Sequence, residues 1–158
     1  MIVLVMGVAG VGKTTIGETL AQALGARFID ADDYHPPENV AKMKAGIPLQ
    51  DADRWPWLQK LNAILRNERK AVLACSALKE SYRRRLAEGV PDFTIVFLHG
   101  TAELIRSRME TRRHRYMPAA LLDSQLATLE PPADAIVIDV AAPLEESVAA
   151  IVKRLQPA

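Results

Sequence analysis

Residues 7–14, Gly7-Val8-Ala9-Gly10-Val11-Gly12-Lys13-Thr14, decide the fold of this chain. They have the P-loop spacing, follow the apolar run 2–6 and open a segment in which apolar residues recur at helical spacing. A strand before the loop and a helix after it are the context that the motif requires. The glycines let successive backbone N–H groups point at one anion, and the helix adds the positive end of its dipole. The stretch predicts a loop that binds the phosphates of a nucleoside triphosphate.

Two side chains of the loop have predicted roles of their own. Lys13 is long enough to reach the outer phosphates, and the Thr14 hydroxyl is placed to ligate Mg²⁺. The alternative, a glycine-rich turn that binds nothing, is disfavoured by the flanking strand and helix. The predicted nucleotide contacts are Gly7, Gly10, Val11, Gly12, Lys13, Thr14 and Thr15.

Length and composition favour one soluble domain over residues 1–158. The formal net charge of +1 gives no reason to expect nucleic acid or a membrane surface as partner. Cys75 is the only cysteine, so no internal disulfide is possible and a reducing compartment is expected. The run 2–6 is too short for a membrane span and lacks a basic leader, so a cytoplasmic location is expected.

Apolar runs and helical segments alternate along the chain. Strands are predicted at 2–6, 27–29, 71–75, 93–98 and 135–139. Helices are predicted from Gly12 to a cap at Gly25, and at 38–44, 55–67 (capped by Asp53), 79–88, 102–116, 119–128 and 144–155. This alternation predicts an α/β fold, a five-stranded parallel sheet with helices on both faces. Ligands of such sheets bind beyond the carboxyl ends of the strands, where the P-loop lies.

Three carboxylates follow the second strand, at Asp30, Asp32 and Asp33. Asp30 and Asp32 share a side if the extended conformation continues, so that one can hold Mg²⁺ through water and the other can accept a proton from a hydroxyl. A solvated acidic loop is the alternative, and the neighbouring P-loop strand favours the functional interpretation. His35 is left open between ligand contact and packing of the loop.

Cations that phosphoryl transfer requires are offered by Arg106, Arg108, Arg112, Arg113 and Arg115. Arg108 and Arg112 are four residues apart and share one helix face. A basic surface helix explains part of the run. A nucleic-acid patch is disfavoured because few aromatic residues are interleaved. The run ends at Met117-Pro118, where a flap can hinge.

A second set of cations follows the third predicted strand. Lys79 and Arg83 are one helical turn apart and are expected to project together toward the cleft, where paired cations suit a carboxylate. Arg54 has either the same role or an ion pair with Asp51 and Asp53. The chain contains no Asn-Lys-x-Asp and no Asp-x-x-Gly sequence, so a small-molecule kinase is favoured over a GTPase.

Longer motifs resemble those of gluconokinases, which are related to shikimate and adenylate kinases. The resemblance spans almost the whole chain and is most specific in Asp-Ala-Asp-Asp-Tyr-His-Pro at 30–36. The other matching stretches are 46–49, 51–58, 75–83, 114–118, Gln125 and 129–131. Ala9 and Val11 stand where the family often has serine, and we expect tuned affinity because backbone N–H groups hold the phosphates.

The resemblance implies transfer of the ATP γ-phosphate to the 6-hydroxyl of D-gluconate, giving 6-phosphogluconate and ADP. It implies that Asp32 is the base or orients the substrate, and that Asp30 supports Mg²⁺. Arg108 would lie against the adenine, and Arg112 would contact the phosphates.

For the substrate side, the resemblance implies a helical segment at about 33–68 and a short lid at 112–118 that excludes water. The residues implied to hold the sugar acid are Arg54, Lys79 and Arg83, with His35 and Gln125 as further candidates. Family members are often homodimers. The alternatives are a kinase for another sugar acid or polyol, and a non-catalytic ATP-binding regulatory module.

Overall fold

The structure, a computed structural model, describes residues 1–111 and 122–156 of the chain. In chain order the elements are β1 (Ile2–Met6), α1 (Lys13–Leu24), β2 (Arg27–Asp30), the 3₁₀ turn η1 (Ala31–Tyr34), α2 (Pro37–Lys44), α3 (Asp51–Arg66), β3 (Ala71–Ala74), α4 (Glu80–Ala87), β4 (Phe93–His99), α5 (Ala102–Thr111), α6 (Leu122–Thr128), β5 (Ile136–Asp139) and α7 (Leu144–Leu155).

The described strands form one parallel sheet in the order β2-β3-β1-β4-β5. β1 lies at the centre, between β3 and β4, so the P-loop leaves the carboxyl end of the central strand. The predicted five-stranded parallel sheet is confirmed. The order of the strands required pairing information that the sequence pattern does not carry.

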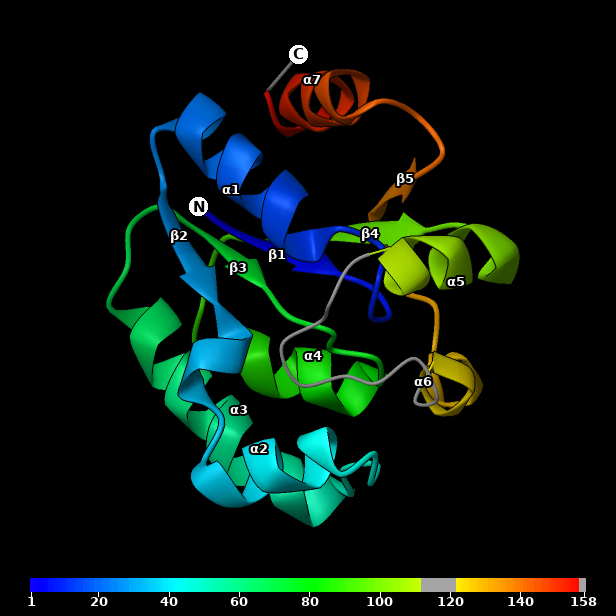
Figure 1. Cartoon of the computed structure of the whole chain (residues 1–158). Coiled ribbons are helices and arrows are strands. Elements are labelled where there is room, and N and C mark those ends of the chain that lie inside the picture. The colour runs from blue at the N-terminus through cyan, green and yellow to red at the C-terminus, as the bar shows by residue number, and fades with distance from the viewer. Residues whose placement is uncertain (112–121, 157–158) are drawn as a thin grey trace.

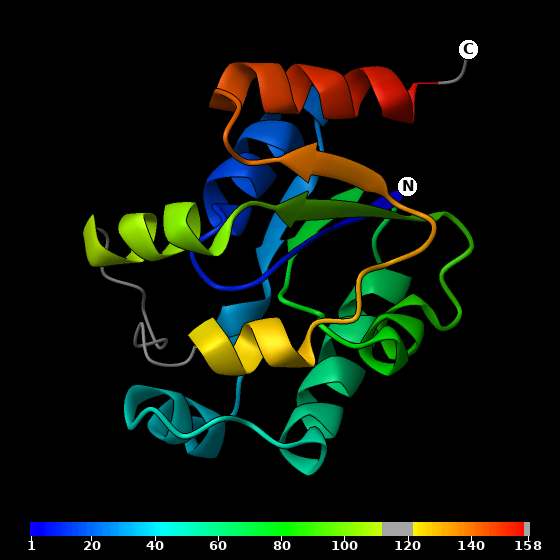
Figure 2. The ribbon, with the colours of Figure 1, turned by 90° about the vertical axis from the view of Figure 1, so that its right-hand side faces the viewer.

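Both faces of the sheet are buried, because successive residues of a strand point to opposite faces. Val3 and Val5 of β1 face the core formed with α1 and α7. Ile2, Leu4 and Met6 face the core formed with α3 and α4. Figure 1 shows α1 and α7 above the sheet and α3 and α4 below it, and Figure 2 shows the same two layers from the side. The predicted helices on both faces are therefore confirmed.

Helix α3 begins earlier than predicted, at Asp51 instead of Trp55. The prediction that Asp53 caps this helix is wrong: Gln50 is the N-cap and Asp53 is the third helical residue. The Asp53 carboxylate accepts the Gln50 backbone N–H at 2.9 Å, while the Gln50 side chain accepts an N–H of the first turn. This reciprocal capping box holds the first turn ahead of Pro56.

The predicted lid at 112–118 and the predicted helix start at 119 lie outside the described residues. Within the described ranges, no helix combines the length and the apolar character needed to cross a membrane.

Candidate active site

A cavity of about 320 Å³ opens at the carboxyl edge of the sheet. Its wall is built from the P-loop, the end of β2, η1, α3, the segment after β3 and α6. The predicted site residues that line it are Gly10, Gly12, Lys13, Thr14, Thr15, Asp30, Asp32, His35, Arg54 and Gln125. Residues from distant parts of the sequence thus meet at one place, as the parallel topology predicts.

The P-loop has a backbone that requires glycine at its turn. Gly10 has φ +88°, and a Cβ there would lie 2.7 Å from the Met109 Cγ atom of α5. Gly12 has φ +95° and precedes α1 directly. A side chain at Gly10 would be both strained and in collision, so this turn of the loop, which predicts an anion-binding backbone, requires glycine.

Lys13 lies inside this loop, and its amine donates to the Val8 carbonyl oxygen at 3.0 Å. Burial lowers the pKa of Lys13, whereas the negative charge of Asp32, the strongest opposing influence, raises it. The amine is thus held in a desolvated position close to the acidic residues. Thr14 and Thr15 are exposed in the wall of the same cavity.

Two of the predicted nucleotide contacts form the base of the loop. Val11 is 1% exposed and belongs to the core on the α1 side. Gly7 approaches β4 so closely that a Cβ would lie 2.7 Å from the Leu98 carbonyl oxygen. These residues anchor the loop to the sheet, so any contact of theirs with the nucleotide is through the backbone.

Gln125 of α6 reaches the P-loop from the opposite side. Its Oε1 atom accepts the Ala9 N–H at 2.7 Å, and the side chain is 7% exposed. A buried backbone N–H needs a partner, and Gln125 supplies it. The residue proposed from the resemblance as a substrate contact thus also fixes the P-loop.

The acidic segment turns sharply after β2. Asp30 Oδ1 accepts the Asp32 N–H at 3.0 Å and starts η1, so the predicted extended conformation does not continue past Asp30. Asp30 and Asp32 nevertheless both line the cavity. Among the described residues, no group of three or more His, Cys, Asp or Glu side chains forms a metal cage. Mg²⁺ in kinases takes one or two carboxylates together with phosphate oxygens and water, so Thr14 and Asp30 fit its requirements.

His35 combines packing with a position beside Asp32. Its ring stacks on Trp57 with 3.9 Å between ring centroids and an interplanar angle of 17°. Its Nε2 atom lies 3.8 Å from Asp32 Oδ1, and its side chain is 3% exposed. Burial, helped by the charge of Arg54, lowers the pKa of His35 to about 4. His35 is therefore neutral at physiological pH.

This burial predicts a pH-dependent stability. Between pH 6.5 and 4 the unfolded chain binds a proton on His35 that the folded chain does not bind. The free energy of unfolding therefore falls as pH falls. The loss between pH 7 and pH 4 should be about 3 kcal/mol larger for the wild type than for His35→Gln. Urea unfolding at both pH values measures it, with exposed His99→Gln as control. Equal losses in wild type and His35→Gln would contradict the prediction.

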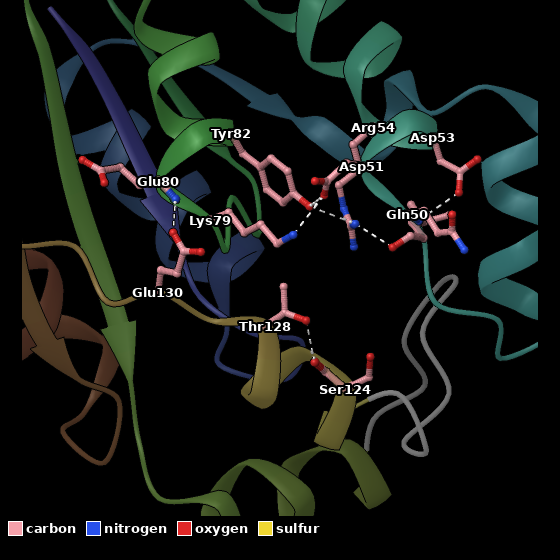
Figure 3. A network of polar contacts seen from close by, with 11 residues as sticks. Gln50, Asp51, Asp53, Arg54, Lys79, Glu80, Tyr82, Ser124, Thr128 and Glu130 are labelled. Atoms are coloured by element: carbon pink, nitrogen blue, oxygen red, sulfur yellow. Dashed lines mark hydrogen bonds and ion pairs between the residues drawn. The ribbon is translucent and has the colours of Figure 1, made fainter.

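Arg54 is held at the edge of the cavity by a polar network (Figure 3). Its Nη1 atom donates to the Leu49 carbonyl oxygen at 2.6 Å and lies 3.1 Å from the Tyr82 hydroxyl. Its guanidinium lies over the Tyr82 ring, 5.1 Å from the centroid. Tyr82 in turn donates to Asp51, and this hydrogen bond lowers the pKa of Asp51. Arg54 thus makes hydrogen bonds to Leu49 and Tyr82 in place of the ion pair with Asp51 or Asp53 that was the alternative.

Lys79 and Arg83 do not project together, so that prediction is wrong. Lys79 donates to Asp51 Oδ1 at 3.1 Å, in the network of Figure 3. Arg83 is 5% exposed, and its guanidinium donates to three backbone carbonyl oxygens. These belong to Ala77 at 2.8 Å, Leu78 at 3.1 Å and Glu130 at 2.8 Å. Arg83 ties α4 to the segment after α6 and borders a separate cavity.

Arg108 of α5 donates to the Val140 carbonyl oxygen at 2.6 Å, beside the chain that follows β5. Arg112 lies outside the described residues. The nucleotide contacts predicted for Arg108 and Arg112 both stay predictions.

Cys75 lines the cavity but is 2% exposed, and burial raises the pKa of its thiol to about 12, which makes it unreactive.

Sequence patterns gave no functional role to Asn39, Trp57 or Tyr82, which support the site. Trp57 is 3% exposed in the core and also lines the cavity. Asn39 and Tyr82 matter through contacts with residues elsewhere in the chain. The sequence signal that could have identified these residues is a polar group at a helical position that faces the core.

Comparison with known proteins identifies the family of this chain. Residues 2–132 match the family model described as an AAA domain. The gluconokinase of Gluconobacter oxydans (strain 621H) is 51% identical, covering 82% of this chain and 75% of the relative. The thermoresistant gluconokinase of Escherichia coli (strain K12) is 39% identical, covering 96% of this chain and 91% of the relative.

Solved structures give the same result. The crystal structure of a gluconokinase from Sinorhizobium meliloti 1021 has a TM-score of 0.88 and 46% identity, covering 97% of this chain and 91% of that chain. Shikimate kinase from Aquifex aeolicus VF5, with 19% identity, a TM-score of 0.65 and coverage of 98% and 96%, shares the fold. The identity, the coverage and the site together show that this chain belongs to the gluconokinase family.

Proposed function

We propose that this protein transfers the γ-phosphate of ATP to the 6-hydroxyl of D-gluconate, giving 6-phosphogluconate and ADP. Membership of the gluconokinase family supports the substrate. The observation that carries the mechanism is that Lys13 and Asp32 line one cavity, with charges that influence each other. A phosphate-binding cation and a carboxylate in one cavity are what phosphoryl transfer to a hydroxyl requires.

In the proposed reaction, the ATP phosphates occupy the P-loop and the Lys13 amine exchanges the Val8 carbonyl for phosphate oxygens. Asp32 accepts the proton of the 6-hydroxyl while the hydroxyl oxygen forms a bond to the γ-phosphorus. The bond from that phosphorus to the β–γ bridging oxygen breaks, and ADP is released. Thr14 and Asp30 would hold Mg²⁺. When bound, the ion neutralises charge on the phosphates.

The carboxylate of gluconate is proposed to contact Arg54. The guanidinium is already oriented by the Leu49 carbonyl and the Tyr82 hydroxyl, so little side-chain entropy is lost when the substrate binds. Lys79 lies near the same place, where its ammonium is paired with Asp51. A pre-oriented arginine suits a planar carboxylate better than a mobile ammonium does.

Arg54→Met is expected to raise the KM for gluconate by about 10- to 100-fold, since a hydrogen bond to a charged group contributes about 1.5–3 kcal/mol. The KM for ATP should change little, because the lost group contacts the other substrate. Steady-state kinetics with each substrate varied measures both. Arg84→Met, an exposed arginine of α4, is the matched control. An unchanged KM for gluconate would remove Arg54 from the substrate site.

The function is tested by ADP release from Mg-ATP with D-gluconate, beside other sugar acids, polyols and shikimate. Turnover on gluconate and on none of the others is the expected result. Turnover on another compound would keep the mechanism and discard the substrate. ATP binding without any turnover would favour a regulatory module instead.

We further propose that the protein acts as a homodimer in the cytoplasm. The resemblance to gluconokinases supports the dimer, and the single cysteine fits a reducing compartment. Light scattering coupled to size-exclusion chromatography tests the mass, for which 17.4 kDa is the value of one chain. A mass of one chain at micromolar concentration would overturn the dimer.

A further inference from the structure

Asn39 of α2 is a buried polar residue that the reaction described above does not use. It is 2% exposed. Its Nδ2 atom donates to the Asp53 carbonyl oxygen at 2.8 Å. A carbonyl oxygen accepts hydrogen bonds and never donates them, so the atom of Asn39 that faces it must be the amide nitrogen. This contact fixes the orientation of the Asn39 amide group.

The same amide nitrogen fixes the proton of a histidine. Asn39 Nδ2 lies 3.2 Å from His35 Nδ1. Because the amide nitrogen has hydrogens and no acceptor capacity, Nδ1 must be the acceptor of this hydrogen bond. A neutral imidazole carries one proton, and with Nδ1 accepting, that proton is on Nε2.

The Nε2 atom faces the carboxylate that is proposed to act as base. It lies 3.8 Å from Asp32 Oδ1, beyond hydrogen-bond distance, so a hydrogen bond requires the Asp32 side chain, which is 51% exposed, to approach the ring. The imidazole itself is held in place. It stacks on the Trp57 indole, whose Nε1–H donates to the Ala31 carbonyl at 2.7 Å. A fixed N–H therefore stands next to the Asp32 carboxylate.

We propose that Asn39 holds His35 as the Nε2–H tautomer, and that this N–H positions the Asp32 carboxylate to receive the proton of the substrate hydroxyl. The inference rests on the proposed function, in which Asp32 is the base. His35 is a positioning residue here: one carboxylate oxygen is occupied by the Nε2–H, and the other is left directed at the hydroxyl. The alternative tautomer would present a lone pair to the carboxylate and repel it.

The tautomer is measured without altering the site. Long-range ¹H–¹⁵N correlation spectra of the ¹⁵N-histidine-labelled protein near pH 7 distinguish Nδ1–H from Nε2–H. The chain has three histidines, so His99→Gln and His114→Gln assign two signals and leave His35 by elimination. The expected pattern is a protonated Nε2 on His35. A protonated Nδ1 would overturn the inference.

The positioning role is tested by two substitutions that both lose the stack on Trp57. His35→Gln places an amide donor near the former Nε2 position, whereas His35→Asn reaches only the former Nδ1 position. We expect kcat of His35→Asn to lie about tenfold below that of His35→Gln, with KM values for gluconate within about threefold of each other. Equal kcat values would assign His35 to packing alone.

The outcomes separate the inference from the proposed function. If the wild type fails to phosphorylate gluconate, the proposed function fails, and the spectrum still reports the tautomer. If the wild type is active but His35 shows a protonated Nδ1, only the positioning role fails.

Discussion

Lys13→Ala is expected to lower kcat for gluconate phosphorylation by about 10³-fold, because one pre-organised charge contact on a developing transition-state charge is lost from a desolvated site. The amine is already inside the loop, 3.0 Å from the Val8 carbonyl, and burial lowers its pKa. Lys13 is partly buried in the cavity wall, where the bound phosphates would further exclude water. Its charge on the phosphates therefore acts at a low effective dielectric constant.

The measurement is single-turnover kinetics at saturating ATP and gluconate, with thermal unfolding to show that the fold is kept. Lys153→Ala, an exposed lysine near the end of α7, is the matched control and should keep wild-type kcat. A loss below about tenfold in Lys13→Ala would contradict the assignment of this charge to the transition state.

Asp32→Asn is expected to lower kcat by about 10³-fold while ATP still binds, since an amide has the shape of the carboxylate but cannot accept the proton. The side chain lines the cavity beside the P-loop and has room for the isosteric group. Calorimetric titration with ATP separates binding from chemistry. The substituted protein should bind ATP with an affinity within about tenfold of the wild type.

Asp33→Asn is the matched control for this experiment. Asp33 lies next to Asp32 in η1, is exposed and carries the same charge. It is not among the described residues that line the cavity. Its substitution should leave kcat within about threefold of the wild type. Near-normal turnover in Asp32→Asn would remove Asp32 from the role of base.

The P-loop and the sheet were predictable because their signals are local. A glycine pattern between a strand and a helix predicts the conformation of the loop directly. The aliphatic runs of buried parallel strands are continuous in the sequence. The start of α3 was missed for a local reason as well. Asp53 was interpreted as the cap of a helix from Trp55, whereas the Gln50–Asp53 capping box begins the helix at Asp51.

The position of Arg83 was not predictable in this way. It is four positions after Lys79, but Lys79 is the N-cap and has extended backbone angles, so helical spacing does not apply between the two. Arg83 is also held by the Glu130 carbonyl, 47 residues away in the sequence. Contacts at that separation leave no trace in a local pattern. The tautomer of His35 depends in the same way on Asp53, which the sequence places far from it.

Asp53 also has a consequence for local unfolding. Its carboxylate accepts the Lys42 ammonium at 2.9 Å and its carbonyl accepts the Asn39 amide at 2.8 Å, so two residues of α2 are bound to the first turn of α3. An eight-residue helix is too short to persist alone. We expect the two segments to open as one cooperative unit, with backbone amides of similar hydrogen-exchange protection. The first turn of α3, which carries Arg54 of the cavity wall, is then coupled to α2 before any ligand arrives.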